Sequence, residues 1–479
     1  MTQHDFGKGV EIVSAERASE AGPVATPHCR LEGIVNRRKG AGGIEYGIRF
    51  AIALPDDWNG RFLLQGGGGL NGTVHAPVGP VASGTRPALA RGFAVLSHDS
   101  GHKGTVWDMT FMSDQRAALD FAEASVRIVA LLGKQVTQSY YGSAPHHSYM
   151  TGCSTGGREG MLASQRYPEL FDGIIVGAPA MRAGDSNLAG DYTKVLLNQV
   201  APRGEDGMPD VTGLLTPQVR QTLLTGLLAQ CDGLDGLKDG MIENVGACDF
   251  QPRKLQCEGE GREGCLSPAL VGALEKGFAG PFDSAGYALY APVAWDTGVM
   301  AMEGGYLPTG APGPFGPPLK ASEIDLDARI NALRADAAGR LTDTNYWTNL
   351  NTYLDRGGKM IFFHGVSDFF FSPWATWDWY ERAGKTNGAR WGEASRFYMV
   401  PGMMHCRGGD AFDSFDMLGP LVEWVEQGKA PEAITAERSA PKPATRPLCP
   451  FPAYARYKGG DAHKAANFVC AAPDQARAE

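Results

Sequence analysis

The chain reads Gly152-Cys153-Ser154-Thr155-Gly156 between a strand-like segment at 148–150 and a helical segment at 157–165. A nucleophile elbow needs a strand, a sharp turn and a helix, because flanking glycines let the backbone take a strained turn that exposes the serine Oγ. The N–H of Thr155 would then point at a developing oxyanion. Ordinary glycine-rich turns between a strand and a helix have the same composition, so partner residues must decide between the two interpretations.

Two later segments provide the partners that such a serine needs. A strand-like run at 359–363 leads into Asp368, and a second run at 397–400 leads into His405. A serine, then an acid, then a histidine, each on a loop after a strand, is the order of the α/β-hydrolase triad. The sequence therefore predicts Ser154 as nucleophile, Asp368 as acid and His405 as base. The alternatives are a turn-capping aspartate and a core histidine.

The spacing of apolar residues predicts the architecture around this site. From residue 46 to 180, apolar runs alternate with helical patterns, which is typical of a parallel sheet covered by helices. The expected strands are 46–54, 61–64, 92–96, 148–150, 171–177, 359–363 and 396–400, and the expected helices are 114–132, 157–165 and 415–427. We therefore expect an α/β fold, with an α/β-hydrolase core over 1–180 and 341–479. The glycine- and proline-rich region 181–340 is expected to form a large inserted lid domain.

Composition excludes two classes of partner. The 479 residues include 44 Lys and Arg against 53 Asp and Glu, and this net charge of −9 is unlike the basic surface of a nucleic-acid binder. The most apolar runs, at 174–176 and 360–363, are far shorter than the ~20 residues of a membrane span. Residues 1–6 have neither the charged nor the apolar region of a signal peptide. We expect a protein that binds neither nucleic acid nor membrane.

Nine cysteines indicate an oxidising compartment, and we expect a secreted or periplasmic protein. Three short intervals resemble local disulfides that close loops: Cys231/Cys248, Cys257/Cys265 and Cys449/Cys470. Reduced, buried thiols are the alternative. No Cys-X-X-Cys pair supports a zinc site.

Two further cysteines flank the predicted site. Cys153 immediately precedes Ser154, and Cys406 immediately follows His405. The serine Oγ and a histidine nitrogen must approach to about 3 Å for proton transfer. Their chain neighbours can then meet the Cα separation of a disulfide, which is about 4.4–6.8 Å. A Cys153–Cys406 disulfide would clamp the two segments together, and two unrelated buried thiols are the alternative.

A glycine-rich loop follows the expected strand at 61–64. It reads Gln65-Gly66-Gly67-Gly68-Gly69-Leu70-Asn71-Gly72 and resembles the loop that gives esterases their second oxyanion N–H. We expect Gly68 and Gly69 to supply this donor beside Thr155. A phosphate-binding loop is disfavoured because no Gly-Lys-Ser/Thr follows, and a flexible turn is the remaining alternative.

An acidic segment of the expected lid has the composition of a cation site. Residues 231–242 place Asp232, Asp235 and Asp239 among glycines that allow tight turns. Calcium takes about six to eight oxygen ligands, including carboxylates and backbone carbonyls. The spacing differs from that of an EF-hand, which ends in a bidentate glutamate. A solvated acidic turn is the alternative.

Aromatic side chains crowd the segment after the predicted acid. It reads Phe369-Phe370-Phe371-Ser372-Pro373-Trp374, and the lid adds Tyr287, Tyr290 and Trp295. Two aromatic walls over Ser154, with Phe371 and Trp295 as substrate contacts, would favour a flat aromatic acyl group. The alternative is that these rings only pack the lid on the core.

These residues together resemble the tannase/feruloyl esterase family, whose mark is a cysteine before the catalytic serine paired with one after the catalytic histidine. Cys153-Ser154, Asp368 and His405-Cys406 match that mark, and the resemblance covers nearly the whole chain. It implies an α/β-hydrolase core with a large lid, and esters of aromatic acids as substrates. It also implies the disulfide pairs 153/406, 231/248, 257/265 and 449/470, which leaves Cys29 over.

The resemblance extends to a calcium loop in the lid. The family's loop matches at Asp232, Asp235 and Asp239. The match implies the backbone carbonyls of Leu237 and Met241 as further calcium ligands.

Choosing a substrate within the family is harder, because it includes feruloyl esterases, tannases and the hydrolase of mono(2-hydroxyethyl) terephthalate. A terephthalate half-ester carries a free carboxylate for which a lid arginine is expected, yet no arginine lies between Arg262 and Arg329. We therefore expect a serine esterase for hydroxycinnamate or gallate esters, free or attached to plant polysaccharide or polyphenol. The alternatives are the terephthalate half-ester, a broader carboxylesterase and, from another class, a calcium-dependent carbohydrate-binding protein.

Overall fold

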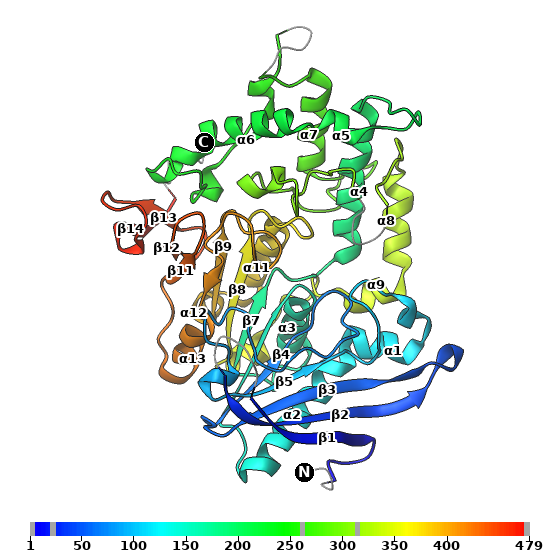
Figure 1. The fold of residues 1–479 in the computed structure, drawn as a ribbon, viewed down its shortest axis with the longest axis vertical. Helices are drawn as coiled ribbons and strands as arrows, with labels where there is room; N and C mark the ends of the chain where they lie inside the picture. Colours follow the sequence, from blue (N-terminus) through cyan, green and yellow to red (C-terminus); the bar gives the residue numbers. More distant parts are fainter. Residues whose placement is uncertain (1–4, 20–24, 259–263, 312–316, 474–479) are drawn as a thin grey trace.

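The computed structural model describes residues 5–19, 25–258, 264–311 and 317–473 (Figure 1). A mixed nine-stranded sheet runs through the molecule in the order β1-β2-β3-β5-β4-β6-β7-β8-β9. Its strands are β1 (Val10–Ser19), β2 (Pro27–Lys39), β3 (Glu45–Pro55), β4 (Arg61–Gln65), β5 (Ala94–His98), β6 (His147–Cys153), β7 (Gly173–Gly177), β8 (Lys359–Gly365) and β9 (Ser395–Val400). Neighbours from β5 to β9 are parallel, whereas β1, β2, β3 and β5 pair in antiparallel fashion.

The central strands are apolar on both faces because helices cover both. Along β4, Phe62 and Leu64 join the buried cluster that includes helix α2 (Ser125–Tyr141). Leu63 between them points the other way and joins the cluster that includes α13 (Leu418–Gln427). Side chains alternate between the faces of a strand, so a strand buried on both faces reads as a continuous hydrophobic run.

The other core elements complete these two layers. The remaining helices are α1 (Gln115–Leu119), α3 (Thr155–Arg166), α10 (Asn351–Asp355), α11 (Pro373–Asn387) and α12 (Ala389–Ala394). Near the carboxyl terminus, one small sheet holds β10 (Ser414–Phe415), β11 (Ile434–Arg438) and β12 (Ala444–Leu448), and another holds β13 (Tyr454–Tyr457) and β14 (Phe468–Ala471). Over the described ranges, no helix is both long and apolar enough to cross a membrane.

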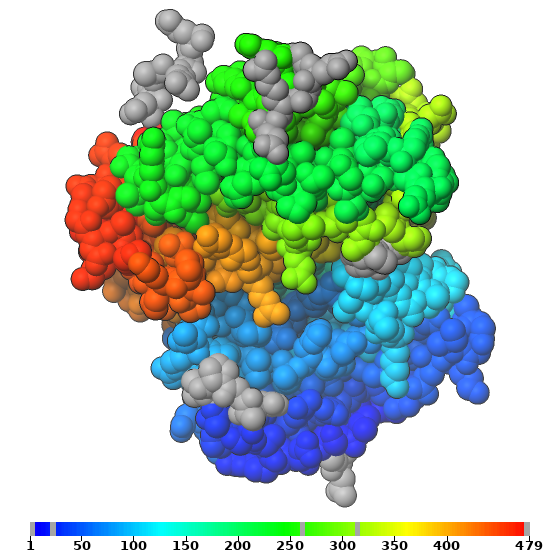
Figure 2. Space-filling view, turned by 45° about the horizontal axis from the view of Figure 1, so that its top comes forward, coloured from blue at the N-terminus to red at the C-terminus, as the bar shows by residue number. Residues whose placement is uncertain are grey.

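Between β7 and β8 the chain leaves the sheet and forms an inserted layer, called the insertion below. Its helices are α4 (Ala183–Val200), α5 (Val211–Leu214), α6 (Pro217–Cys231), α7 (Pro268–Ala279), α8 (Leu326–Ala335) and α9 (Ala337–Thr342). The insertion has an apolar cluster of its own, which includes Leu223, Leu227, Leu270 and Leu274. It lies against the core as a separate layer, drawn in green to yellow-green (Figures 1 and 2). Ligands of α/β sheets bind at the carboxyl ends of the strands, and the insertion covers that end.

The structure is an α/β fold, as the sequence predicts, and it differs from the expected elements in several places, among them the two small carboxyl-terminal sheets. The antiparallel edge strands β1 and β2 are additional, because most side chains of β1 are solvent-exposed and leave a weak hydrophobic pattern. The expected helix at 114–132 is divided by a π-helical turn at Asp120–Ala124 and continues to Tyr141. The expected helix at 415–427 begins only at Leu418, because Ser414–Phe415 pair with β11.

Candidate active site

Ser154 lies on the sharp turn between β6 and α3. Its backbone has φ 62° and ψ −122°, in the left-handed region that is strained for a residue other than glycine. The turn is held because Ser154 N–H donates to Gly177 O at 3.0 Å and Ser154 O accepts from Ala180 N–H at 3.1 Å. A Cβ on Gly152 would lie 2.4 Å from the Gly156 carbonyl carbon, so this approach requires glycine. The geometry is that of a nucleophile elbow.

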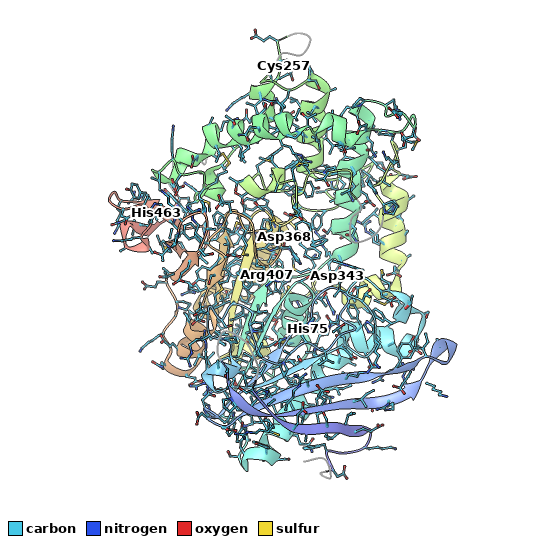
Figure 3. All side chains as sticks on the ribbon, in the orientation of Figure 1. His75, Cys257, Asp343, Asp368, Arg407 and His463 are labelled. Atoms are coloured by element: carbon cyan, nitrogen blue, oxygen red, sulfur yellow. A yellow bond between two sulfur atoms is a disulfide. The ribbon has the colours of Figure 1, made fainter. Side chains whose placement is uncertain are left out.

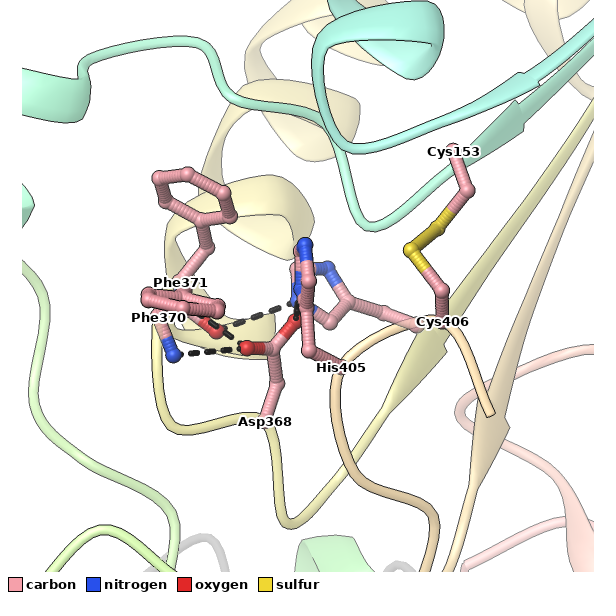
Figure 4. The surroundings of a disulfide bond; sticks show 7 residues. Cys153, Asp368, Phe370, Phe371, His405 and Cys406 are labelled. Carbon is pink, nitrogen blue, oxygen red and sulfur yellow. Dashed lines mark hydrogen bonds and ion pairs between the residues drawn. A yellow bond between two sulfur atoms is a disulfide. The ribbon is translucent and has the colours of Figure 1, made fainter. Parts of the chain in front are cut away.

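Asp368 and His405 meet at the carboxyl ends of the neighbouring strands β8 and β9. His405 Nδ1 lies 2.7 Å from Asp368 Oδ2. The second oxygen of Asp368 accepts the backbone N–H of Phe370 at 2.8 Å and of Phe371 at 3.1 Å (Figure 4). Burial alone would raise the pKa of Asp368, but the two neighbouring histidines, His405 and His364, outweigh burial and lower it. The carboxylate is therefore ionised and oriented toward His405.

The second histidine on Asp368 was not anticipated by the sequence reasoning. His364 is fully buried, and its Nε2 lies 3.1 Å from Asp368 Oδ2 and 3.1 Å from the carbonyl oxygen of Phe371. Its Nδ1 lies 3.0 Å from Thr376 Oγ1. The available signal was a histidine at the end of the same strand, four residues before the acid. His364 helps to hold the acid loop against α11.

A disulfide links the serine turn to the histidine loop. Cys153 and Cys406 are bonded with their Cα atoms 6.0 Å apart (Figure 4). Among the described residues, His405 hydrogen-bonds to Asp368, whereas Ser154 Oγ has no hydrogen bond to His405. The disulfide is thus the direct connection between the two segments in this state.

Among the described residues there are four disulfides. The other three join Cys231 to Cys248, Cys257 to Cys265 and Cys449 to Cys470. Cys29 is unbonded and half-buried, and burial raises the pKa of its thiol.

The glycine-rich loop lies against the serine turn. Gly156 N–H donates to Gly67 O at 2.9 Å, and the Thr155 hydroxyl donates to Gly69 O. Within the described part of the chain, the backbone N–H groups of Gly68, Gly69 and Thr155 have no hydrogen-bond acceptor. The structure thus brings together the three residues expected to supply oxyanion donors.

A buried glutamate, also missed by the sequence reasoning, supports this loop from beneath. Glu159 on α3 is fully buried, and its carboxylate accepts Gly67 N–H at 3.0 Å, Asn71 Nδ2 at 3.1 Å and Ser100 Oγ at 3.3 Å. It lies on α3, five residues after Ser154, so its carboxylate connects the glycine-rich loop to the helix that follows the elbow.

Aromatic rings surround His405. The ring centroids of Phe369, Phe370 and Phe371 lie 6.3, 5.0 and 5.4 Å from the imidazole centroid. Trp107, from the loop after β5, lies 5.9 Å from Phe370 and is 38% exposed. Because Val106 O accepts Leu70 N–H at 2.9 Å, this loop also contacts the glycine-rich loop.

Trp295 does not join this aromatic group, contrary to the sequence expectation. It stacks on Phe278 at 3.5 Å and contacts Phe250 edge-on at 4.8 Å, within the apolar cluster of the insertion. Its position is decided by the insertion's own core. Phe371 instead lines a hollow with Tyr290 and Arg182.

The acidic loop of the insertion folds back on its own backbone. Asp232 Oδ1 accepts the N–H groups of Asp239 at 3.2 Å and Gly240 at 3.1 Å, and Asp235 Oδ1 accepts that of Leu237 at 2.8 Å. Asp235 Oδ2 is buried with no partner in the described residues. Burial and the neighbouring carboxylates raise the pKa of Asp235 to about 6.

The donor chemistry of this loop suits a hard cation. It offers carboxylate oxygens and turn carbonyls, and a cation would satisfy the orphaned Asp235 oxygen. The carboxylate of Asp239 is also paired with Arg446 at 2.8 Å. Over the described residues, one cluster, formed by His146, His147 and Glu426, brings three metal-type ligand atoms within 4.8 Å of one another. It lies at the start of β6, and Glu426 there is already paired with Arg61 at 2.6 Å.

Asp368 lies where the sheet meets the insertion, near the centre of the molecule (Figure 3). A serine on a strained turn, an oriented acid–histidine pair and unpaired backbone donors occupy one place there. This arrangement is suited to acyl transfer.

The chain is similar to known proteins along nearly its whole length. The family model of tannase and feruloyl esterase matches residues 34–333 and 335–471. The chain is 37% identical to mono(2-hydroxyethyl) terephthalate hydrolase of Piscinibacter sakaiensis, over 96% of this chain and 87% of that protein. It is 30% identical to a protein described as probable feruloyl esterase B-2 of Aspergillus flavus, over 81% and 76%. The crystal structure of feruloyl esterase B from Aspergillus oryzae shares the fold, with a TM-score of 0.79 at 23% identity over 97% of each chain.

Proposed function

Because the chain belongs to the tannase and feruloyl esterase family and is a carboxylic ester hydrolase, we propose that it is a serine esterase acting on esters of aromatic carboxylic acids. The observation that carries the proposal is the 2.7 Å contact between Asp368 and His405. This pair is joined through Cys406 and Cys153 to the strained turn at Ser154.

The proposed mechanism assigns a residue to each step of hydrolysis. Ser154 Oγ attacks the ester carbonyl while His405 takes its proton, and His405 then returns that proton to the leaving alcohol. Asp368 orients the imidazole and stabilises its protonated form. The N–H groups of Thr155 and of Gly68 or Gly69 hold the negative oxygen of the tetrahedral intermediate. Water, activated by the same histidine, then hydrolyses the acyl-enzyme.

The rings of Phe370, Phe371 and Trp107 support an aromatic acyl group. A flat ring can stack on these walls, and aromatic pairs contribute about 0.5–1.5 kcal/mol beyond area burial. We propose hydroxycinnamate or gallate esters as the preferred substrates, free or attached to plant polysaccharide or polyphenol.

A second candidate substrate is mono(2-hydroxyethyl) terephthalate. It is supported by the 37% identity to the hydrolase of that ester in Piscinibacter sakaiensis. Comparing kcat/KM on methyl ferulate, methyl gallate and this half-ester separates the two candidates.

We propose Ca²⁺ as a structural ion in the acidic loop, held by Asp232, Asp235 and Asp239 and the carbonyls of Leu237 and Met241. When bound, the ion would satisfy the buried Oδ2 of Asp235, which has no partner in the described residues. The loop lies beside the Cys231–Cys248 disulfide. Four disulfides further support a secreted or periplasmic location, because such bonds persist in oxidising compartments.

The serine mechanism is tested by Ser154→Ala and His405→Ala. Each should lower kcat on methyl ferulate by about a thousandfold or more, since triad members act as a unit. A fluorophosphonate probe should label the wild type and leave Ser154→Ala unlabelled. Ser164→Ala is the matched control, because that hydroxyl donates within α3 to Met161 O at 2.8 Å and should be silent. Wild-type turnover in Ser154→Ala would exclude the mechanism.

A further inference from the structure

Asp296 of the insertion is fully buried at the seam between the insertion and the core. Its Oδ2 accepts the hydroxyl of Ser367 at 2.7 Å and the backbone N–H of Gly402 at 2.7 Å. The Ser367 hydroxyl in turn accepts Gly298 N–H at 3.0 Å. One carboxylate oxygen thus contacts two loops of the core.

These two loops carry the acid and the base. Ser367 immediately precedes Asp368, and Gly402 lies three residues before His405. In the described structure the core itself links the two loops by the backbone bond from Ser367 N–H to Met403 O at 3.0 Å and by the contact between Asp368 and His405. Asp296 adds a side-chain bridge, and it comes from a different layer of the protein.

The contribution of Asp296 to the stability of the fold does not by itself explain why a carboxylate bridges these loops. A buried carboxylate is costly unless hydrogen bonds satisfy it, and Asp296 Oδ1 has no partner in the described part of the structure. Burial raises the pKa of Asp296 despite the hydrogen bonds from Ser367 and Gly402. What the carboxylate supplies is one acceptor oxygen that both loops share.

The insertion also holds the far end of the acid loop. Ser372 Oγ donates to Pro292 O at 2.5 Å, and Ser372 N–H donates to Tyr290 Oη at 3.2 Å. Both ends of the segment from Ser367 to Ser372 are therefore hydrogen-bonded to the insertion, with Asp368 between them. The insertion therefore holds the segment that carries Asp368 at both of its ends.

We propose that Asp296 is a positioning residue, through which the insertion sets the relative placement of the Asp368 and His405 loops. This inference rests on the proposed serine mechanism. Asp296 touches neither substrate nor reacting atoms, and it acts through Ser367 and Gly402. A shift of about 1 Å in such a pair is enough to lower turnover by roughly a hundredfold.

The test uses Asp296→Ala, Asp296→Asn and Ser367→Ala in the full chain, with p-nitrophenyl acetate, whose acyl group is aliphatic, as the substrate. Asp296→Ala removes the shared acceptor and should lower kcat by about 10- to 100-fold with KM within about twofold. The acid limb of the kcat/KM profile should move to lower pH, because a displaced Asp368 favours the protonated base less. Asp296→Asn keeps one acceptor oxygen and should recover most of that loss. Ser367→Ala removes one of the two contacts and should shift both quantities in the same direction by less.

Asp191→Ala is the matched control, because Asp191 is an insertion carboxylate paired with Lys194 and Arg329. It should leave kcat and the pH profile unchanged. Each rate is measured well below the melting temperature of its variant. An Asp296→Ala protein with wild-type kcat, or with lowered kcat and an unmoved acid limb, would overturn the proposal. Failure of the serine mechanism itself would show separately, as activity retained by Ser154→Ala.

Discussion

Cys153 and Cys406 are bonded with their Cα atoms 6.0 Å apart, and each adjoins one residue of the proposed reaction. Ser154 follows the first cysteine, and His405 precedes the second. Ser154 and Cys406 both have positive φ, of 62° and 67°. The covalent link therefore includes one strained backbone position, Cys406, and adjoins the other, Ser154.

Replacing both Cys153 and Cys406 by alanine should lower kcat by roughly a hundredfold, because the serine and histidine segments lose their direct connection. Steady-state kinetics on methyl ferulate checks this. The matched control is Cys449→Ala with Cys470→Ala, which removes a disulfide from the carboxyl-terminal strands. That control should lower the melting temperature and leave kcat nearly unchanged. Equal losses of kcat in both double variants would contradict the clamping role.

Asp368→Asn should lower kcat by about 10³- to 10⁴-fold while the protein stays folded. The asparagine can no longer supply the charge that stabilises a protonated His405. His364→Gln should lose far less activity, because the 2.7 Å contact from His405 to Asp368 remains. Circular dichroism confirms folding, and kcat on one ester ranks the variants. A larger loss of kcat in His364→Gln than in Asp368→Asn would show that the roles of these two residues are assigned wrongly.

Removing calcium with a chelator should lower the melting temperature clearly, whereas the initial rate of hydrolysis should change little. A bound ion stabilises the native state by RT ln(1 + [L]/Kd), about 2.7 kcal/mol at a hundred times Kd. Asp235→Asn should make the melting temperature insensitive to added Ca²⁺. Asp206 is an exposed carboxylate of the insertion outside the loop, so the melting temperature of Asp206→Asn should still respond to Ca²⁺. An unchanged melting curve after stripping, with no calcium by elemental analysis, would count against the ion.

Phe371→Ala and Trp107→Ala should each reduce the preference for methyl ferulate over p-nitrophenyl butyrate by several-fold, since each removes an aromatic wall. Trp295→Ala should instead lower the melting temperature and spare the preference, because Trp295 stacks on Phe278 inside the insertion. Ratios of kcat/KM on the two esters give the result. Equal losses of kcat/KM on aromatic and aliphatic esters would show that these rings only pack against neighbouring residues and do not contact the acyl group.

Glu426→Gln should destabilise the protein at neutral pH. Burial would raise the pKa of Glu426, but hydrogen bonds from Arg61 and Tyr149 lower it to about 2. A depressed carboxyl pKa contributes stability above the unfolded value of about 4.3 and loses it as pH falls through the folded value. The difference in melting temperature between wild type and variant should therefore shrink from pH 5 to pH 2.

The exposed Glu423 lies on the same helix, so Glu423→Gln is the control. The melting temperature of Glu423→Gln should equal that of the wild type at every pH. If the difference in melting temperature between wild type and Glu426→Gln stays constant from pH 5 to pH 2, the partners of Glu426 do not lower its pKa.

Much of the fold and the core of the site can be predicted from sequence. Strands buried on both faces, such as β7 and β8, leave continuous apolar runs that mark them. The glycines around Ser154 signal a strained turn, and Asp368 and His405 follow strand patterns that place them at one edge of the sheet. These signals are local, since each depends on residues within one segment of the chain.

The tertiary structure alone decided how separate segments meet. Trp295 and Trp107 carry similar sequence signals, yet one stacks within the insertion and the other lies on Phe370 beside His405. Glu159 and Asp296 look like ordinary acidic residues, yet both are buried as acceptors that hold loops of the site. The sequence by itself determined which residues have chemistry and in what order they occur. Their partners depend on contacts between segments tens to hundreds of residues apart, which leave no periodic pattern in the chain.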